Sequence, residues 1–220
     1  MKVLVTAGST CVPIDSVRAI GNVFRGDTGA QIARYIWEEG HEVTLLTSSY
    51  MYTVTSITCQ TGVHLISFRT FDELANLMER EITSGGYDAI IHSAAVSDYR
   101  VSQVLIRQGD TFQPVDNTQK ISSSHKKLYL ELEPTIKLVD QIREPWGFTG
   151  TLVKFKLQVG ISDEELIEIA KKSLAVSRAN YIVANCREWY KQRAYVISAD
   201  GFVDHISREK LPEVLHWRLK

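Results

Sequence analysis

The chain has 220 residues, of which 44% are hydrophobic and 23% are charged. This composition is typical of a soluble globular protein and excludes a disordered or fibrous chain. The formal net charge of -1 gives no overall attraction to nucleic acid or to an anionic membrane, so we expect neither as a partner.

The cysteines and the amino-terminal sequence indicate a cytoplasmic protein. Cys11, Cys59 and Cys186 lie far apart, with no CxxC spacing and no neighbouring pair of histidines. This spacing argues against a zinc site and against a disulfide framework. The first apolar run is too short for a secretory signal, and no run approaches the length of a membrane span. We therefore expect a cytoplasmic location and assign no residue as a metal ligand.

The amino-terminal part of the chain predicts one crossover unit of a parallel sheet. Residues 3–6 form an apolar run that ends before Gly8, which favours a strand buried on both faces. Apolar residues then recur at helical spacing over residues 32–37, and residues 43–47 form a second buried strand. Strand, helix and strand in this order indicate a right-handed βαβ unit.

The pattern repeats and then stops. Residues 63–68 predict a strand, Thr70 and Glu73 form a capping box for the next helix, and residues 88–93 predict another buried strand. From about residue 100 to 127 no period is evident. We interpret this segment as an irregular, extended flap or dimerisation arm, because long irregular segments in compact domains are usually functional or disordered.

The carboxyl-terminal half predicts further strands and helices. We expect strands over residues 128–132, 151–156 and 181–185, a helix beginning at Pro134, and a helix after the capping box of Ser162 and Glu165. A hairpin over residues 194–206 and a short helix close the chain. The fold class is therefore α/β: a doubly wound, mostly parallel, Rossmann-like sheet with an extended flap and a C-terminal hairpin, in a single domain over residues 1–220.

The loop after the first strand is the first candidate site. It lacks the GxGxxG pattern, so a dinucleotide is not specifically indicated. Gly8, Ser9 and Thr10 can present N–H groups and hydroxyls to a phosphate, although a plain turn explains them equally well. Asn22 can hold a reacting centre through its carboxamide, or can simply form a turn.

A second candidate lies after the strand at residues 88–93. Asp98 follows this strand, where open α/β sheets bind ligands, and can contact a metal-bridged phosphate or a ribose hydroxyl; a cap or turn residue is the alternative. Lys120 in the flap can face a triphosphate or belong to a solvated surface. Asp15 and Arg18 fit a solvated ion pair, and His92 fits a hydrogen-bonded core residue.

Several motifs taken together resemble one family. VTAGST, VPIDSVRAIGN, RGDTG, AAVSDYR, KISS, VKFK and YIVAN, in this order, resemble the phosphopantothenate-cysteine ligases, especially the monofunctional bacterial type. The resemblance implies that CTP, or ATP, together with Mg2+, activates the carboxylate of 4'-phosphopantothenate as an acyl-nucleotidate. L-cysteine then attacks this intermediate in a step of coenzyme A biosynthesis. The resemblance also implies a homodimer in which the flap helps to form the interface.

The same resemblance implies roles for individual residues. Asn22 matches the asparagine that handles the acyl-nucleotidate, and Lys120 matches the first lysine of a motif carried on the flap. Asp98 and Phe155 match nucleotide-contacting residues, Lys172 answers to a phosphate-binding lysine, and the Gly8–Thr10 loop lies on the nucleotide side. At two loop positions where the family usually has serines, this chain has Val23 and Phe24.

Two other functions fit the sequence. The strand, loop and helix at the amino terminus suit an NAD(P)- or flavin-dependent oxidoreductase, which the missing GxGxxG pattern disfavours. A nucleotide-binding relative without catalytic activity is the other alternative. Nucleotide binding without turnover would distinguish that relative from a ligase.

Overall fold

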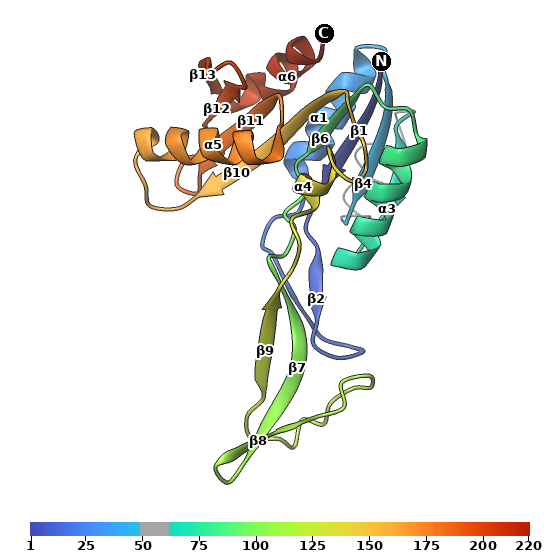
Figure 1. The fold of residues 1–220 in the computed structure, drawn as a ribbon, viewed down its shortest axis with the longest axis vertical. Helices are drawn as coiled ribbons and strands as arrows, with labels where there is room; N and C mark the ends of the chain where they lie inside the picture. Colours follow the sequence, from blue (N-terminus) through green and yellow to red (C-terminus); the bar gives the residue numbers. More distant parts are fainter. Residues whose placement is uncertain (49–61) are drawn as a thin grey trace.

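Within residues 1–48 and 62–220, which the computed structural model describes, an eight-stranded sheet forms the body and a three-stranded sheet extends from it as an arm (Figure 1). Cys59 lies outside the described residues. In spatial order, the central sheet consists of β13 (Val203–Ser207), β12 (Arg193–Ser198), β11 (Tyr181–Cys186), β10 (Thr151–Gln158), β6 (Ala89–His92), β1 (Lys2–Ala7), β4 (Glu42–Thr47) and β5 (His64–Ser67).

The order of the strands places a topological switch between β1 and β6. Neighbouring strands from β5 to β11 are parallel, whereas β12 and β13 are antiparallel to the strands beside them. The chain runs outward from β1 to β4 and β5, then returns to β6 on the other side of β1. The predicted doubly wound, mostly parallel sheet with a C-terminal hairpin is therefore confirmed. In such sheets ligands bind at the carboxyl ends of the strands, beside the switch.

Helices cover both faces of the central sheet (Figure 1). Side chains of α1 (Asp27–Glu38) and α6 (Leu211–Leu219), which follows the short helix η2 (Arg208–Lys210), pack on the face that carries Val3 and Val5. Those of α3 (Phe71–Ser84), α4 (Leu138–Gln141) and α5 (Asp163–Ser177) pack on the face that carries Leu4. Because both faces are covered, β1 is a continuous apolar run rather than an alternating one. Both predicted capping boxes are present, at the start of α3 and of α5.

The arm corrects one prediction from the sequence. Its strands β7 (Tyr99–Gln108), β8 (Thr111–Pro114) and β9 (Tyr129–Pro134) are antiparallel and regular, although irregular structure was expected from about residue 100. Most of their side chains are exposed or only partly buried, so no alternation of apolar and polar residues marks these strands. The expected irregular structure is found over residues 115–127.

The predicted helix at Pro134 is also wrong. Pro134 ends β9, and α4 begins only at Leu138. Between them, the N–H of Thr135 donates to the Asp98 carbonyl at 2.9 Å and its hydroxyl donates to the Ser97 carbonyl at 2.7 Å. These contacts keep the chain extended beside the start of β7, so the helix begins one turn later than predicted.

A small hairpin interrupts the connection between β1 and α1. Its strands are β2 (Cys11–Pro13) and β3 (Ala19–Gly21), which pair antiparallel to each other. The hairpin carries Asp15 and Arg18 at its tip and leads directly into Asn22. It lies beside the base of the arm, as Figure 1 shows for β2.

Candidate active site

The turn after β1 is fixed by close backbone packing. Gly8 has φ +85, and a side-chain Cβ there would lie 2.1 Å from the Ser48 hydroxyl oxygen. The Gly8 carbonyl accepts the N–H of Ala95 at 2.8 Å, which joins this turn to the segment after β6. Only glycine suits this position, because both the left-handed conformation and the available space exclude a side chain.

The amino terminus of α1 packs directly against this turn. Gly26, with φ +94, is so close that a Cβ would lie 2.4 Å from the Gly8 nitrogen. A Cβ at Gly29 would lie 2.5 Å from the Ser93 hydroxyl oxygen. Gly26 makes no side-chain cap for α1, so the first N–H groups of the helix remain available to an anion.

These three glycines take the roles of the GxGxxG pattern in space. Gly8 makes the turn, Gly26 permits close backbone approach, and Gly29 lets the helix pack on the strands. Gly26 and Gly29 keep the GxxG spacing, whereas the β2–β3 hairpin separates them from Gly8 in the sequence. A motif search along the chain therefore misses an arrangement that the fold assembles.

A cavity of about 280 Å³ opens between this turn and the hairpin. Its lining comes from β2, from β3 and from the loops after β1, β3, β4 and β5. The described residues that form it are Ser9, Cys11, Ala19, Asn22, Phe24, Arg25, Ser48 and Arg69. Of the predicted site residues, the cavity brings together Ser9 and Asn22. Ser48 and Arg69 were missed by sequence reasoning; the available signal was that each follows the carboxyl end of a parallel strand.

Asn22 makes the contact of a turn-forming residue and also lines the cavity. Its side-chain oxygen accepts the N–H of Phe24 at 3.3 Å, which is the contact of a turn-forming residue. Its side chain is also exposed and lines the cavity. The Ser9 hydroxyl donates to the backbone carbonyl oxygen of Asn22 at 3.4 Å. The turn contact uses the amide oxygen and leaves the amide NH2 group without a hydrogen-bond partner among the described residues.

Thr10 links two loops. It is fully buried, its hydroxyl donates to the Ser97 hydroxyl at 3.0 Å, and the N–H of Ser97 donates back to the Thr10 hydroxyl at 2.8 Å. The N–H of Thr10 donates to the Ala95 carbonyl at 3.2 Å. Its polar groups therefore hold the loops after β1 and β6 together.

Lys120 is exposed and does not line the cavity, but the residue beside it is firmly held. Ile121 is buried; its N–H donates to the Asp15 carboxylate at 3.1 Å and its carbonyl accepts from Arg18 at 2.9 Å. The expectation of a solvated Asp15–Arg18 pair is wrong, because the Asp15 side chain is 0% exposed. The hydrogen bond from Arg18 holds the pKa of Asp15 far below its usual range.

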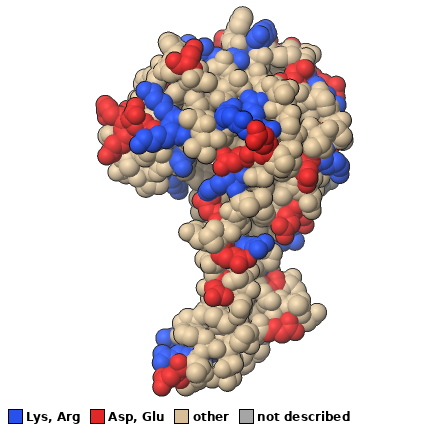
Figure 2. Space-filling view, viewed as in Figure 1, with Lys and Arg blue, Asp and Glu red and all other residues tan. Residues whose placement is uncertain are grey.

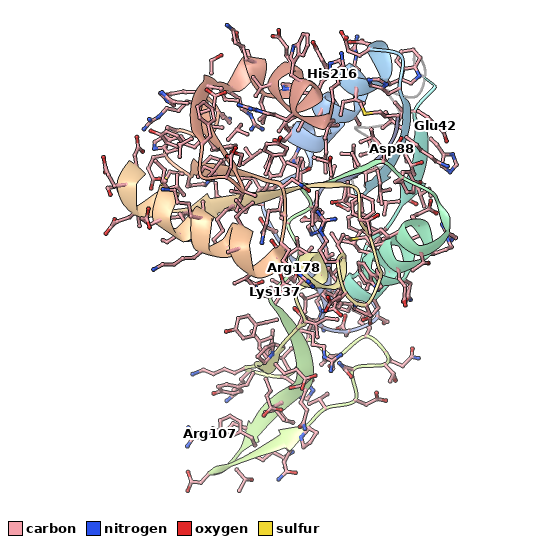
Figure 3. All side chains as sticks on the ribbon, turned by 45° about the horizontal axis from the view of Figure 1, so that its top comes forward. Glu42, Asp88, Arg107, Lys137, Arg178 and His216 are labelled. Carbon is pink, nitrogen blue, oxygen red and sulfur yellow. The ribbon has the colours of Figure 1, made fainter. Side chains whose placement is uncertain are left out.

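The remaining predicted residues lie outside the cavity. Asp98 is exposed and forms an ion pair with Lys137 at the base of the arm; Figure 3 labels Lys137 there. Phe155 is half-buried and packs on the sheet face covered by α1 and α6. Lys172 is exposed on α5, which covers the opposite face. None of the three contacts another predicted site residue through a hydrogen bond or ion pair among the described residues.

Polar side chains are buried on three neighbouring strands at the switch point, β1, β6 and β10. Thr6 of β1 and His92 of β6 are hydrogen-bonded at 2.9 Å, so the prediction of a hydrogen-bonded core histidine is confirmed. Lys154 of β10 lies beside His92 and donates to the Ser173 carbonyl at 3.1 Å and to the Ser177 hydroxyl at 3.0 Å. Burial, and secondarily the charge of Lys154, lowers the pKa of His92 to about 4. Burial also lowers the pKa of Lys154.

An aromatic cluster holds the loop that carries Asn22. Phe24 packs edge-on against Tyr190 with ring centroids 5.7 Å apart, and the guanidinium of Arg187 lies 5.5 Å from the Phe24 ring and 5.6 Å from the Tyr190 ring. The segment after β11 thereby supports the loop before α1. These contacts account for an aromatic residue at position 24 of this chain.

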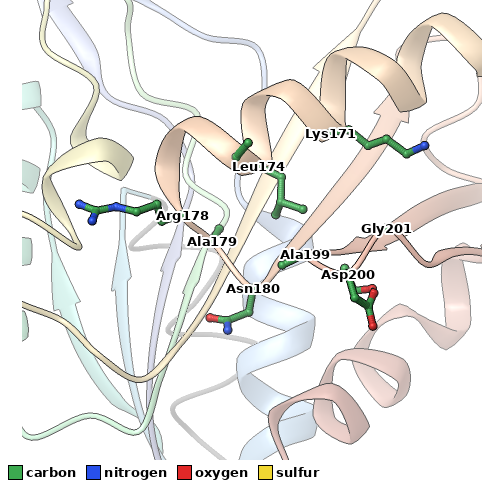
Figure 4. A pocket seen from close by; sticks show the side chains of 10 residues that line it. Lys171, Leu174, Arg178, Ala179, Asn180, Ala199, Asp200 and Gly201 are labelled. Carbon is green, nitrogen blue, oxygen red and sulfur yellow. The ribbon is translucent and has the colours of Figure 1, made fainter.

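A larger cavity, of about 490 Å³, lies at the opposite edge of the sheet (Figure 4). It is formed by the end of α5, the start of β11 and the β12–β13 turn. Its cationic residues have acidic partners: Arg178 pairs with Glu144, and Lys171 pairs with Glu168. Since ligands in such sheets bind at the carboxyl ends of the strands, the smaller cavity beside Asn22 is the candidate site.

The described residues contain neither a group of potential metal ligands nor a helix that could span a membrane. Within residues 1–48 and 62–220, no three His, Cys, Asp or Glu side chains are grouped as metal ligands would be. No helix in the same ranges has the length and apolar character needed to cross a membrane.

Comparisons with known proteins identify relatives over most of the chain. Residues 1–203 match the family model of the DNA/pantothenate metabolism flavoprotein C-terminal domain. The coenzyme A biosynthesis bifunctional protein CoaBC of Thermococcus kodakarensis is 36% identical over 189 residues, which are 84% of this chain and 41% of that protein. CoaBC of Methanocaldococcus jannaschii is 25% identical over 184 residues, which are 84% of this chain and 40% of that protein. The chain thus spans about two fifths of these relatives.

Solved structures share the fold. The DNA/pantothenate metabolism flavoprotein of Streptococcus pneumoniae has a TM-score of 0.84 and 28% identity, with 99% of this chain and 97% of that chain covered. A Cab2 mutant in complex with phosphopantothenate-cysteine has a TM-score of 0.70 and 18% identity, with 99% and 87% covered. At 18% identity the likeness concerns the fold alone.

Proposed function

Because this chain belongs to the family of the DNA/pantothenate metabolism flavoprotein C-terminal domain, we propose that it is a phosphopantothenate-cysteine ligase of coenzyme A biosynthesis. The family membership inferred from the sequence motifs is confirmed. The observation that carries the proposal is that Ser9, Asn22 and Arg25 line one cavity, and that Arg25 directly precedes the N-cap of α1, where no side chain caps the helix. A protein of the same fold binds phosphopantothenate-cysteine, the product that this reaction would form.

The proposed reaction has two steps. A carboxylate oxygen of 4'-phosphopantothenate attacks the α-phosphorus of CTP, and the bond between the α-phosphorus and its β-bridging oxygen breaks to release pyrophosphate. The amine of L-cysteine then attacks the acyl carbon, CMP leaves with the acyl C–O bond electrons, and the amine proton passes to solvent. Positioning and charge stabilisation supply the rate enhancement of such steps.

The residues around the cavity suit these requirements. The amide NH2 of Asn22 can donate to the acyl oxygen of the nucleotidate and to the oxyanion formed on aminolysis. Ser9 lines the cavity, and Gly8 packs against Gly26 at the start of α1, whose first N–H groups favour a phosphate. Thr10, through its bonds to Ser97, keeps this turn in place.

Two of the more distant residues act on the nucleotide in this proposal. Lys120 approaches the phosphates when the segment over residues 115–127 covers the site. Asp98 contacts the nucleoside, whereas Phe155 and Lys172, which lie on opposite faces of the sheet, have no assigned contact with it. A Mg2+ ion bound to the triphosphate oxygens, which are the ligands it prefers, would neutralise part of the triphosphate charge. Asp98, an exposed carboxylate, is the side chain of the proposed set that can share this ion.

We also propose that the active form is a cytoplasmic homodimer joined through the arm. The arm carries exposed large apolar residues, namely Tyr99, Phe112 and Leu132. Figure 2 shows acidic and basic side chains scattered over the arm, with uncharged surface between them. Light scattering after gel filtration should give twice the chain mass, and Leu132→Asp should reduce it towards that of a single chain.

The activity is tested by incubating the pure protein with 4'-phosphopantothenate, L-cysteine, MgCl2 and either CTP or ATP. Pyrophosphate release that requires the pantothenate substrate supports the ligase, and no release with either nucleotide overturns it. Nucleotide binding without turnover would indicate an inactive relative. A visible flavin spectrum or tight NADPH binding would favour an oxidoreductase instead.

A further inference from the structure

Two arginines of the candidate cavity have no partner for their charge among the described residues. Arg25 comes from the loop before α1, and Arg69 comes from the segment between β5 and α3. Within residues 1–48 and 62–220, neither guanidinium has an ion pair, a side-chain hydrogen bond or an aromatic ring beside it. Both residues are exposed, and both line the cavity beside Asn22.

Every other arginine of the chain is engaged among the described residues. Eight are ion-paired with carboxylates, Arg143 donates to carbonyl groups, Arg187 lies over aromatic rings, and Arg208 donates to the Thr28 hydroxyl. The stretch over residues 49–61 contains no Asp or Glu, so its sequence offers no acidic partner. The two arginines without partners are thus the two that line one cavity.

The rest of the cavity suits an anion with several oxygens. No acidic residue is among its described lining, whereas Ser9, Ser48 and Asn22 provide hydroxyl and amide donors. The volume of about 280 Å³ is at the small end for a ligand site, so it suits a group such as a diphosphate better than a whole nucleotide. A guanidinium binds phosphate oxygens with two parallel hydrogen bonds, which favours arginine for this task.

Backbone contacts hold Arg69 at the cavity. Its carbonyl accepts the N–H of Cys11 at 2.8 Å, and its N–H donates to the Glu73 carboxylate at 2.6 Å. The first bond ties the segment after β5 to the hairpin, and the second belongs to the capping of α3. The side chain of Arg69 is left free while its backbone is fixed from both sides.

We propose that Arg25 and Arg69 together bind the terminal phosphates of the nucleotide co-substrate and the pyrophosphate that leaves. When the bond from the α-phosphorus to the bridging oxygen breaks, its electrons move onto that oxygen, and the two guanidiniums stabilise the added charge. This inference rests on the proposed ligase function for its chemistry. The binding of pyrophosphate itself requires no turnover.

The test is calorimetric titration of the purified protein with inorganic pyrophosphate at low salt, for wild type, Arg25→Gln and Arg69→Gln. Each substitution removes charge-assisted hydrogen bonds, so we expect pyrophosphate binding to weaken roughly 10- to 100-fold. Arg80→Gln, which removes an equal charge from an exposed and ion-paired arginine of α3, should bind as the wild type does. Arg69→Lys keeps the charge but loses the fork of donors, and should bind with intermediate affinity.

The outcomes separate this inference from the ligase proposal. The inference would be overturned if the wild-type protein binds no pyrophosphate. It would also be overturned if the Arg25→Gln and Arg69→Gln variants are folded and bind pyrophosphate with unchanged affinity. Both outcomes count even if ligation is observed. Pyrophosphate binding lost in both variants would support it even if no ligation occurs. Thermal unfolding of each variant shows whether it is folded. If Arg69→Gln does not fold, the pyrophosphate affinity of Arg69→Lys tests the role of Arg69 instead.

Discussion

The N–H of Ile121 donates to the carboxylate of Asp15 at 3.1 Å, although 106 residues separate them in the chain. Arg18 completes the contact by bonding both the carboxylate and the Ile121 carbonyl. The tip of the β2–β3 hairpin therefore holds the segment that carries Lys120. The position of this lysine depends on a carboxylate in a different part of the chain.

Asp15→Asn should loosen this segment. The amide keeps the shape of the carboxylate but loses the ion pair with Arg18, and one of its two terminal groups no longer accepts a hydrogen bond. We expect faster hydrogen exchange at Ile121 and a loss of ligation of roughly tenfold or more. Asp110→Asn is the matched control, because Asp110 is fully exposed at the arm tip, where Figure 3 labels its partner Arg107. Equal effects of the two substitutions would contradict this prediction.

Substitutions of Asn22 and Lys120 should stop the reaction at different points. Asn22→Asp replaces an amide donor by a carboxylate, so aminolysis should slow and the acyl-nucleotidate should accumulate. Lys120→Gln removes a positive charge needed when the triphosphate reacts, so the intermediate should not form. Rapid quenching followed by chromatography of labelled nucleotide distinguishes the two. The assignment fails if the two variants accumulate the same species.

His92 should make stability depend on pH. Its pKa is about 4 in the folded protein, against about 6.5 when unfolded, so the unfolded chain binds the proton more tightly. The contribution of His92 to the free energy of unfolding should therefore be fully present above pH 6.5 and should decrease as the pH falls towards 4. The free energy of unfolding should be lower at pH 5 than at pH 7 by about 2 kcal/mol. Burial also lowers the pKa of His41, which adds a slope of the same sign.

Urea unfolding at pH 7 and pH 5 checks this dependence. His92→Gln should lose stability at pH 7, because the Thr6 contact is altered, but should show a smaller difference between the two pH values. His64→Gln, at an exposed position of β5, should retain the full difference. An unchanged difference in His92→Gln would rule out His92 as its source.

Lys154 should contribute little net stability through its charge. Its ammonium group is buried, and the Ser177 hydroxyl also donates to the Ser173 carbonyl at 3.1 Å, so that acceptor keeps a partner without the lysine. The free energy of unfolding of Lys154→Met should lie within about 1 kcal/mol of the wild-type value or exceed it, because the cost of burying a charged group disappears. NMR titration should show a raised pKa for His92 in this variant. A loss above about 3 kcal/mol would mean that the buried charge stabilises the fold.

The fold of the body could be predicted because each of its strands is covered on both faces. Continuous apolar runs mark β1 and β4, and side-chain capping marks the start of α3 and α5. The arm could not be predicted in this way, because its strands have no buried face. The start of α4 was misplaced because contacts from Thr135 to Ser97 and Asp98, which the local sequence does not contain, override the signal of Pro134.

The candidate site was predicted in part. Ser9 and Asn22 are adjacent to recognisable turns and do line the cavity. Arg69 has no local motif, since what distinguishes it is that its guanidinium forms no ion pair among the described residues. The burial of Asp15 could not be inferred either, because its partner Ile121 lies beyond several intervening elements. The state of the Arg69 and Asp15 side chains depends on contacts between distant parts of the chain, which residue type alone does not indicate.

The contact between Gly26 and Gly8 has a consequence for the evolution of this site. The ends of the inserted hairpin meet through backbone atoms, so the contact of α1 with the turn after β1 does not pass through the hairpin. Hairpin positions outside the contacts made by Thr10, Asp15 and Asn22 are therefore free to vary, as surface insertions with adjacent ends are. Grafting the hairpin of a relative between positions 9 and 25 should transfer its substrate preference while leaving the scaffold folded.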